Sequence, residues 1–205
     1  MIKIDKAEVF NFEGALRGMR NPLESNRNSD SHMFWGDEFH EYIIGEKDLA
    51  LASRLANAGA DHGKFLRQIF VSIDVTAPLY WFKEFDTYKV GTVANSTSTM
   101  HLLGSRDLVY DDFSWDYPTA FRTCYLIHIN ELIATWRKDK SEENFRIMIQ
   151  DLLDSFNQTR TITLNYAVLR NIYSSRKNHK LLEWRLFCDW IREQPYASEL
   201  IISSK

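Results

Sequence analysis

The sequence predicts an α+β fold with few strands and about five helices. Two segments, residues 2–10 and 65–77, alternate apolar and polar side chains with the period of a half-buried strand. Several longer segments space their apolar residues three and four apart, as amphipathic helices do. Strands and helices that do not alternate regularly along a chain are typical of α+β domains. We therefore expect helices around a small sheet.

The N-terminal part of the chain is predicted to hold one strand and one short helix. Residues 2–10 form the strand. Residues 15–26 form the helix, which Pro22 breaks because proline lacks the N–H that a helix needs. Residues 21–45 are polar and irregular, and we assign no element to them.

The next helix and strand have clearer patterns. Residues 46–59 form a helix that stops at Gly59, a residue type common at helix C-termini. Residues 65–77 form the second strand. The residues expected to be buried are Leu49, Leu51, Leu55 and Ala56 in the helix and Ile69, Val71, Ile73 and Val75 in the strand.

The chain beyond residue 117 is predicted to be helical. Residues 118–140 form a long helix, and residues 141–156 form another, which Ser141 caps. Residues 163–195 form further helices, with a break around Lys177 to His179. We find no internal repeat.

Composition favours a single domain, residues 1–205, that binds neither nucleic acid nor a membrane. A chain of 205 residues with 44% hydrophobic content can bury one sizeable core. Its 25 Lys and Arg against 28 Asp and Glu give a net charge of −3, too balanced for a nucleic-acid or membrane-surface scaffold. No apolar run approaches the roughly 18 residues of a membrane helix.

The two cysteines are expected to be free thiols. Cys124 and Cys188 stand in helical surroundings without CxxC or His-rich spacing, which argues against a disulfide and against a metal site. Free thiols fit a reducing compartment, so we expect a cytoplasmic protein.

Residues 77–101 pass from aromatic side chains to a run of hydroxyls, Ser96 to Thr99. A segment that only had to pack would not need that run. One interpretation is a Ser/Thr-rich turn that links a helix to a loop. The other is a loop whose backbone N–H groups and hydroxyls hold a phosphate.

This segment resembles the signature of the flavin-dependent thymidylate synthases, a family often called ThyX. In that family a strand ending in Ala-Pro leads through an aromatic helix into RHRxxSxNExSxRY. Counted from Ala77 and Pro78 without a gap, the signature falls on Thr87, Tyr88, Lys89, Thr92, Ala94, Asn95, Thr97, Thr99 and Met100. The resemblance implies that the nucleotide-binding residues are Glu84, Asn95, Ser96, Thr97, Ser98 and Thr99, and that Tyr88 and Lys89 bind the flavin.

A second segment, residues 165–184, resembles the family helix NxRxLxxFxxxR. Asn165, Leu169, Asn171, Ile172 and Arg176 keep its frame. The spacing of Asn165 and Arg176 puts an amide and a guanidinium on one helix stripe. The resemblance implies that Asn165 and Asn171 contact the flavin and that Arg176, the residue assigned a catalytic role, holds the pyrimidine base. The alternative is that Asn165 caps the helix and Arg176 faces solvent.

A third, weaker match concerns two histidines. The family turn GHxTPFEH aligns with residues 61–68, so His62 takes the place of its first histidine. His179 stands one residue closer to Arg176 than the corresponding family histidine. The resemblance implies that both bind the cofactor. The resemblance covers residues 49–190 and leaves out residues 21–45, which we interpret as an insertion relative to the family.

The chain also departs from the family pattern. Signature arginines become Thr87, Lys89 and Thr99, so most of the positive charge expected against phosphates is missing. The candidates to replace it are Lys83, Lys89, Arg160, Lys177 and Lys180.

The resemblance implies a small central, mostly antiparallel sheet flanked by helices, and a homotetramer. It also implies an enzyme that uses FAD, NADPH and methylenetetrahydrofolate to methylate C5 of dUMP. Two alternatives remain open: a relative that acts on another pyrimidine deoxynucleotide, and a non-catalytic binding or assembly protein.

Overall fold

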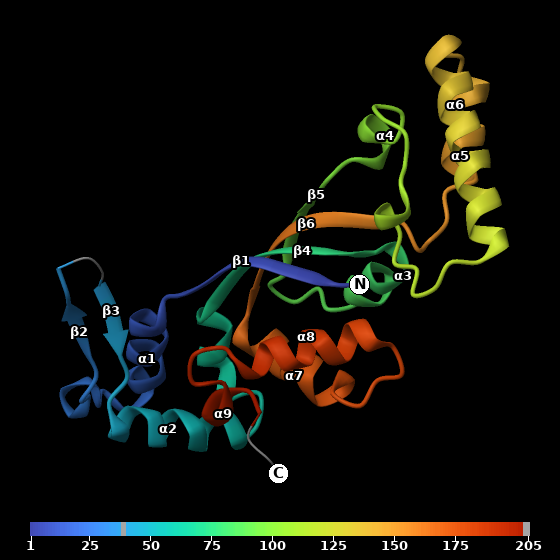
Figure 1. Cartoon of the computed structure of the whole chain (residues 1–205). Coiled ribbons are helices and arrows are strands. Elements are labelled where there is room, and N and C mark those ends of the chain that lie inside the picture. Colours follow the sequence, from blue (N-terminus) through green and yellow to red (C-terminus); the bar gives the residue numbers. More distant parts are fainter. Residues whose placement is uncertain (38–39, 203–205) are drawn as a thin grey trace. The chain divides into compact units, whose positions relative to one another are not determined.

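The computed structural model describes residues 1–37 and 40–202, and it confirms the α+β fold with a small, mostly antiparallel sheet flanked by helices (Figure 1). The sheet has the strand order β1-β4-β6-β5. The bounds of its strands are Lys3–Phe10 for β1, Phe70–Pro78 for β4, Asn157–Asn165 for β6 and Val93–Ser96 for β5.

The described chain divides into two compact units. The first unit contains residues 1–5, 74–87 and 94–161, and the second contains residues 6–73, 88–93 and the chain from Ile162 onward. The central strands β4 and β6 pass from one unit to the other. The expectation of a single domain stays a prediction.

The first unit is built from helices and a long loop beside its strands. Its helices are α3 (Leu79–Phe85), α4 (Thr99–Leu102), α5 (Ala120–Lys138) and α6 (Glu142–Gln150). The α5 and α6 helices lie side by side as an antiparallel pair (Figure 1). Ser141 accepts a hydrogen bond from the Asn144 N–H, which confirms the predicted cap of α6.

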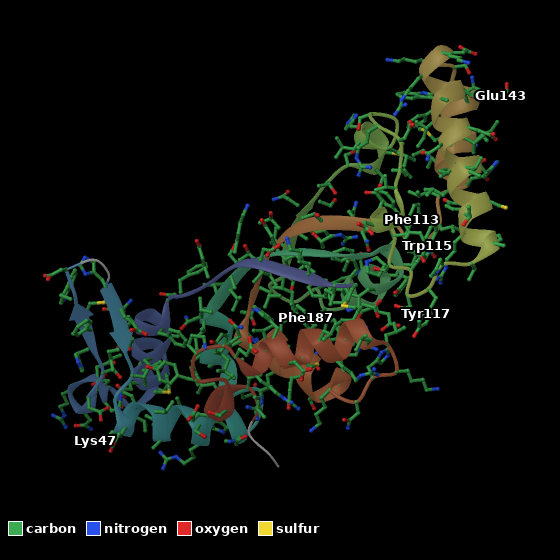
Figure 2. The ribbon with its side chains drawn as sticks, in the orientation of Figure 1. Lys47, Phe113, Trp115, Tyr117, Glu143 and Phe187 are labelled. Carbon is green, nitrogen blue, oxygen red and sulfur yellow. The ribbon has the colours of Figure 1, made fainter. Side chains whose placement is uncertain are left out.

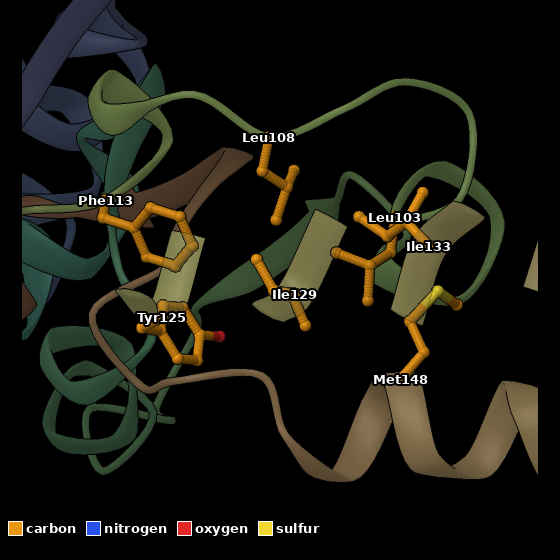
Figure 3. Packing of buried hydrophobic residues seen from close by; sticks show 7 residues of the cluster. All are labelled: Leu103, Leu108, Phe113, Tyr125, Ile129, Ile133 and Met148. Atoms are coloured by element: carbon orange, nitrogen blue, oxygen red, sulfur yellow. The ribbon is translucent and has the colours of Figure 1, made fainter. Parts of the chain in front are cut away.

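A buried apolar cluster fixes the α5–α6 pair and the loop before it (Figure 3). The side chains of the cluster are Leu103, Leu108, Phe113, Tyr125, Ile129, Ile133 and Met148. The Phe113 ring stacks on Trp115 with centroids 4.2 Å apart, and both side chains are labelled in Figure 2. The loop that carries Leu108 and Phe113 is therefore packed despite its lack of periodic pattern.

The second unit contains most of the remaining helices and a hairpin. Its elements are α1 (Phe12–Arg20), β2 (His32–Trp35), β3 (His40–Ile43), α2 (Glu46–Asn57), a 3₁₀ turn (Gly63–Gln68), α7 (Tyr166–Arg176), α8 (Leu182–Arg192) and α9 (Ala197–Leu200). The break between α7 and α8 confirms the predicted interruption around residues 177–179.

Residues 21–45, to which the sequence analysis assigned no element, contain the β2–β3 hairpin, paired antiparallel, whose four-residue strands carry little pattern. Several other sequence predictions were wrong in detail. Residues 163–165 end strand β6 and are not helical, and α6 stops at Gln150 instead of reaching residue 156. Residues 65–68 form a 3₁₀ turn before the strand.

The buried face of α2 also differs from the prediction. Its buried residues are Asp48, Ala52 and Ala56, which follow one another at intervals of four. The predicted leucines Leu49, Leu51 and Leu55 are only half-buried. The buried stripe of this helix is thus lined with small residues and one carboxylate. The four strand residues predicted to be buried, Ile69, Val71, Ile73 and Val75, are confirmed.

Candidate functional site

Arg176, at the C-terminus of α7, lies against two aromatic rings of the second unit. Its Nε donates to the Tyr88 hydroxyl at 2.9 Å. The guanidinium carbon lies 4.9 Å from the ring centroid of Trp184, a fully buried residue of α8, and 5.8 Å from that of Tyr88. A guanidinium over an aromatic face is attracted by the ring's negative quadrupole. We call Arg176, Tyr88 and Trp184 the arginine clamp.

His179 lies beside the arginine clamp. Its backbone N–H donates to the Arg176 carbonyl at 2.9 Å, and its Nδ1 accepts from the Leu181 N–H at 3.2 Å. Since Nδ1 accepts, the neutral imidazole carries its proton on Nε2. The ring packs edge-on against Trp184, with centroids 6.3 Å apart. The backbone of the α7–α8 break therefore fixes the position and the tautomer of this histidine.

Asn165 joins β6 to α7 and caps the helix. Its Oδ1 accepts from the Val168 N–H at 3.1 Å, and its Nδ2 lies 3.5 Å from the Val90 carbonyl. A Cβ on Gly91 would come within 2.6 Å of that Nδ2, and Gly91 has a φ of +74° that favours glycine. The interpretation of Asn165 as a cap is confirmed. The other part of that alternative, that Arg176 faces solvent, is not confirmed, because Arg176 is half-buried.

Asn171 is exposed on α7 and lines a groove of about 610 Å³ in the second unit. The groove is formed mainly by small residues and amides, and its lining includes Ala58, Gly59, Ala60, Gly63, Asn165, Ala167 and Asn171. Arg67 and Arg170 also line it. Arg170 donates to the Leu200 carbonyl and to Asn57 Oδ1, and burial lowers its pKa.

Besides Tyr88 and His179, two more predicted cofactor residues lie outside this groove. His62 is exposed and lines another cavity of the second unit, of about 940 Å³, with Met19, Leu51 and Phe65. Lys89 is exposed next to Tyr88. The cofactor residues predicted from the sequence are therefore spread over the clamp, the groove and the surface.

The hydroxyl run lies in the first unit, where strand β5 ends. The Thr97 N–H donates to the Thr159 carbonyl at 2.9 Å, and the Thr97 hydroxyl accepts from the Thr159 N–H at 3.3 Å. Ser98 caps the short α4 by accepting from the His101 N–H at 3.3 Å. Asn95 and Ser96 are exposed in the strand itself. Part of the run therefore does have the structural role of a Ser/Thr-rich turn.

Thr97, Ser98 and Thr99 also line a cavity of about 330 Å³, which we call the hydroxyl cavity. Its other polar lining residues are Thr76, Ser105, Arg106, Asp111, Asp112, Asn157 and Thr159. Glu84, Asn95 and Ser96 are not among its lining residues.

The arginine of the hydroxyl cavity is paired with a carboxylate. Arg106 donates through both terminal nitrogens to Asp112, at 2.7 and 2.5 Å. Burial tends to raise the pKa of Asp112, but hydrogen bonds from Arg106 and the Val109 N–H outweigh it, and this pKa is lowered. The bond to Asp112 raises the pKa of Arg106. Sequence reasoning missed this pair, because the loop that holds it has no periodic pattern.

Two of the lysines and arginines proposed to replace the missing signature arginines are also paired. Lys83 lies 2.5 Å from Asp154. Arg160 donates to Asp86 at 2.8 Å, and its guanidinium lies 3.9 Å from the ring centroid of Phe82. Arg160 thus joins β6 to α3, and Lys83 joins α3 to the turn before β6, within the first unit.

The fold resembles solved structures over nearly its full length. Thymidylate synthase X from Helicobacter pylori, with FAD and dUMP, has a TM-score of 0.73 at 14% identity, covering 98% of this chain and 97% of that chain. The fold is that of ThyX. The UMP/dUMP methylase PolB from Streptomyces cacaoi, bound with 5-Br dUMP, has a TM-score of 0.64 at 12% identity, covering 99% of this chain and 95% of that chain. No protein-family model and no curated protein matches the sequence.

On this ThyX fold, three groups of predicted residues are found together. Tyr88, Arg176 and His179 meet around Trp184, while Asn165 and Asn171 line the groove. Thr97, Ser98 and Thr99 line the hydroxyl cavity in the other unit. Trp184 was not among the site residues predicted from the sequence, although it is the buried centre of the clamp.

Proposed function

We propose that the protein is an FAD-dependent enzyme of the thymidylate synthase type. It transfers a one-carbon unit from methylenetetrahydrofolate to C5 of the pyrimidine of dUMP or a related substrate, with NADPH as the reductant. The fold and the arginine clamp support this proposal. The clamp is the observation that carries it, because it gives a half-buried guanidinium a fixed orientation.

The arginine clamp is suited to hold a pyrimidine. A guanidinium presents five N–H donors in a plane, and the Nε donor of Arg176 is fixed by Tyr88. A uracil carbonyl accepts such donors, and negative charge that the base carries when it is activated to react through C5 strengthens the bond. Arg176 would therefore bind the base and stabilise its charge. We propose no nucleophilic role for Thr97, because its hydroxyl accepts from the Thr159 backbone N–H, a structural contact between β6 and the end of β5.

The groove around Asn171 fits the ring of a flavin. The flavin ring is flat and carries carbonyl and N–H groups along its edge. Its site therefore needs a space wide enough for the flat face and amide groups that can hydrogen-bond to the edge. The groove is lined by alanines and glycines, by the exposed amide of Asn171 and by Arg67. Bound FAD would supply hydride transfer. The protein's own residues would orient the ring and hold the base.

The pairing of Lys83 and Arg160 favours a second candidate function. Since these cations already have carboxylate partners, they are poorly available to a diphosphate. A non-catalytic protein of the same fold, retained for nucleotide binding or assembly, would lose nothing by such pairing.

Flavin binding tests the proposal. The purified protein should show flavin absorbance or gain thermal stability with FAD, and it should methylate a uracil-containing substrate when methylenetetrahydrofolate and NADPH are supplied. Asn171→Leu should weaken FAD binding by roughly 3- to 10-fold without unfolding the protein, because it removes one exposed amide. Asn178→Leu, also exposed but outside the groove, is the matched control.

A colourless protein whose thermal stability FAD leaves unchanged would contradict the enzyme and favour the non-catalytic candidate. Equal losses of FAD affinity in Asn171→Leu and Asn178→Leu would show that the groove is not the binding site.

We also propose a homotetramer with closed symmetry. The α5 helix exposes the apolar side chains of Phe121 and Ile127, which are 68% and 57% accessible. Contact with another subunit would remove these side chains from water. Sedimentation at micromolar concentration should show four chains, and Ile127→Glu should dissociate them. Leu23→Glu, at another exposed apolar position, in the other unit, is the control. A monomeric parent protein would refute the assembly.

The described residues form no helix long and apolar enough to cross a membrane. Cys124 and Cys188 are free thiols, as predicted. Because free thiols persist in a reducing compartment, we propose that the protein is cytoplasmic.

A further inference from the structure

We propose that the cavity of about 940 Å³ in the second unit binds a small amphipathic anion, a molecule with an apolar chain or ring and one carboxylate or phosphate group. We call this cavity the basic cavity. It is distinct from the groove around Asn171 and from the arginine clamp. Part of its lining, Pro22, Leu23 and Ser25, belongs to residues 21–45, the segment interpreted as an insertion relative to the ThyX family.

The basic cavity lies where packed elements of the second unit meet. The helices α1 and α2 and the 3₁₀ turn Gly63–Gln68 contact one another (Figure 1). Beside the cavity, the buried pair of Arg20 and Asp48 joins the end of α1 to α2. The walls are therefore fixed by the fold of one unit, and the volume falls within the range of roughly 300–1,000 Å³ that is usual for small-molecule sites.

The deeper part of the lining is apolar. Met19 and Phe65 are buried, and Leu51 and Leu55 are half-buried. Leu23, which also lines the cavity, is 85% exposed, so folding leaves this side chain in water. An apolar chain or ring in the cavity would remove Leu23 and the two half-buried leucines from water, which favours binding.

The exposed part of the lining is cationic. Arg54, Lys64 and Arg67 are exposed, and their side chains form no hydrogen bond or ion pair within the part of the chain that the structure describes. Arg20 also lines the cavity, but it is already paired with the buried carboxylate of α2. Among the described lining residues, Asp61 is the one carboxylate. The cavity therefore attracts anions, although the chain as a whole has a net charge of −3.

An amphipathic anion matches both parts of the lining at once. Its apolar part would cover the buried and half-buried side chains, and its charged group would stay beside the exposed cations and water. Guanidinium groups such as that of Arg54 form strong, charge-assisted hydrogen bonds with carboxylates and phosphates. A neutral apolar molecule would gain nothing from the cations, and a small inorganic anion would leave the apolar walls in water.

Calorimetric titration of the full chain with octanoate, octyl phosphate and octanol tests the site. The three probes share one apolar chain and differ in the charged group. We expect one saturable site per chain for the two anions, with affinities at least about 5-fold higher than for octanol, because only the anions pair with the cations. The anion that binds more tightly identifies the charged group that the site prefers.

Charge variants test the cations directly. Arg54→Gln and Lys64→Gln should each weaken binding of the anions by roughly 3- to 10-fold and leave octanol binding unchanged, because each removes one charged donor. Arg27→Gln and Lys47→Gln are the matched controls, at exposed positions of the same unit outside the cavity. Lys47 is labelled in Figure 2. Arg67 is left unchanged, because it also lines the groove around Asn171.

A third variant tests the apolar walls. Leu51→Trp places a larger side chain in the cavity and should weaken binding of all three probes, whereas Leu49→Trp, half-buried on the same helix outside the lining, should not. Octanol binding as tight as octanoate binding would overturn the proposal. So would the absence of saturable binding of either anion, or equal anion affinities in the charge variants and their controls.

Discussion

Replacing Asp48 with alanine should lower the free energy of unfolding by about 3–5 kcal/mol, because it leaves a buried arginine without its partner. Asp48 is fully buried in α2, and Arg20, at the end of α1, is 6% exposed. Arg20 Nε lies 2.5 Å from Asp48 Oδ1. The loss would be measured by chemical denaturation.

The same carboxylate anchors the segment before the β2–β3 hairpin. Its Oδ2 accepts from the hydroxyls of Ser29 and Ser31, each at 2.5 Å. Asp30, between them, accepts from the N–H groups of Lys47 and Asp48 and so caps α2. The Asp48 variant should therefore loosen residues 29–31 as well as the Arg20 contact, and hydrogen exchange there should rise.

The effect has a definite pH dependence. Burial tends to raise the pKa of Asp48, but the hydrogen bonds from Ser29, Ser31 and Arg20 outweigh it, and the pKa is lowered. A carboxyl group with a lowered pKa stabilises the fold above its unfolded value of about 3.9, and this contribution is lost as pH falls through the folded value. The parent and Asp48→Ala proteins should therefore converge in stability in acid.

Glu41→Ala, at an exposed position of β3, is the control and should change stability little. A loss of under about 1 kcal/mol for Asp48→Ala would mean that Arg20 finds another partner or reaches water, against the buried geometry.

The fold class was predictable because it depends on pattern, and strand β6 was missed because its pattern is weak. Residues 159, 161 and 163 are all threonines, while the buried positions between them include only Ile162 and Leu164 as large apolar side chains. Arg160 in the same alternation suggests a surface segment, although it packs on Phe82. Burial of this strand comes from its place between β4 and β5.

The candidate site was predictable only where spacing along one element decides it. The interval from Asn165 to Arg176 places both residues on one helix, and the structure has that helix. The partners of Arg176 could not be read from spacing, since Tyr88 is 88 residues away. The charge of the hydroxyl cavity was equally hidden, because Arg106, Asp112 and the hydroxyls come from separate turns.

Replacing Trp184 with alanine should cost about 3–5 kcal/mol of stability, and it should release Arg176 from its fixed position. Trp184 is fully buried and contacts the rings of Tyr88, His179 and Phe187, with centroids 5.9, 6.3 and 6.2 Å from its own. Its removal opens a cavity beneath the guanidinium. Chemical denaturation would measure the free energy of unfolding, and calorimetric titration with uracil-containing nucleosides and nucleotides would measure the binding affinity.

Trp184→Phe separates the two effects, because it keeps an aromatic face near Arg176 while giving up part of the packing. It should retain ligand affinity better than Trp184→Leu, which has no ring.

The stacking of Arg176 on Trp184 is measured by a double-mutant cycle of Trp184→Leu and Arg176→Leu, with an expected coupling energy of about 0.5–2 kcal/mol. Tyr88→Phe removes only the hydroxyl that accepts from Nε, and should cost about 0.5–1.5 kcal/mol. If the coupling is zero and all variants bind the ligand as the parent does, Arg176 stabilises the α7–α8 corner and does not hold the base.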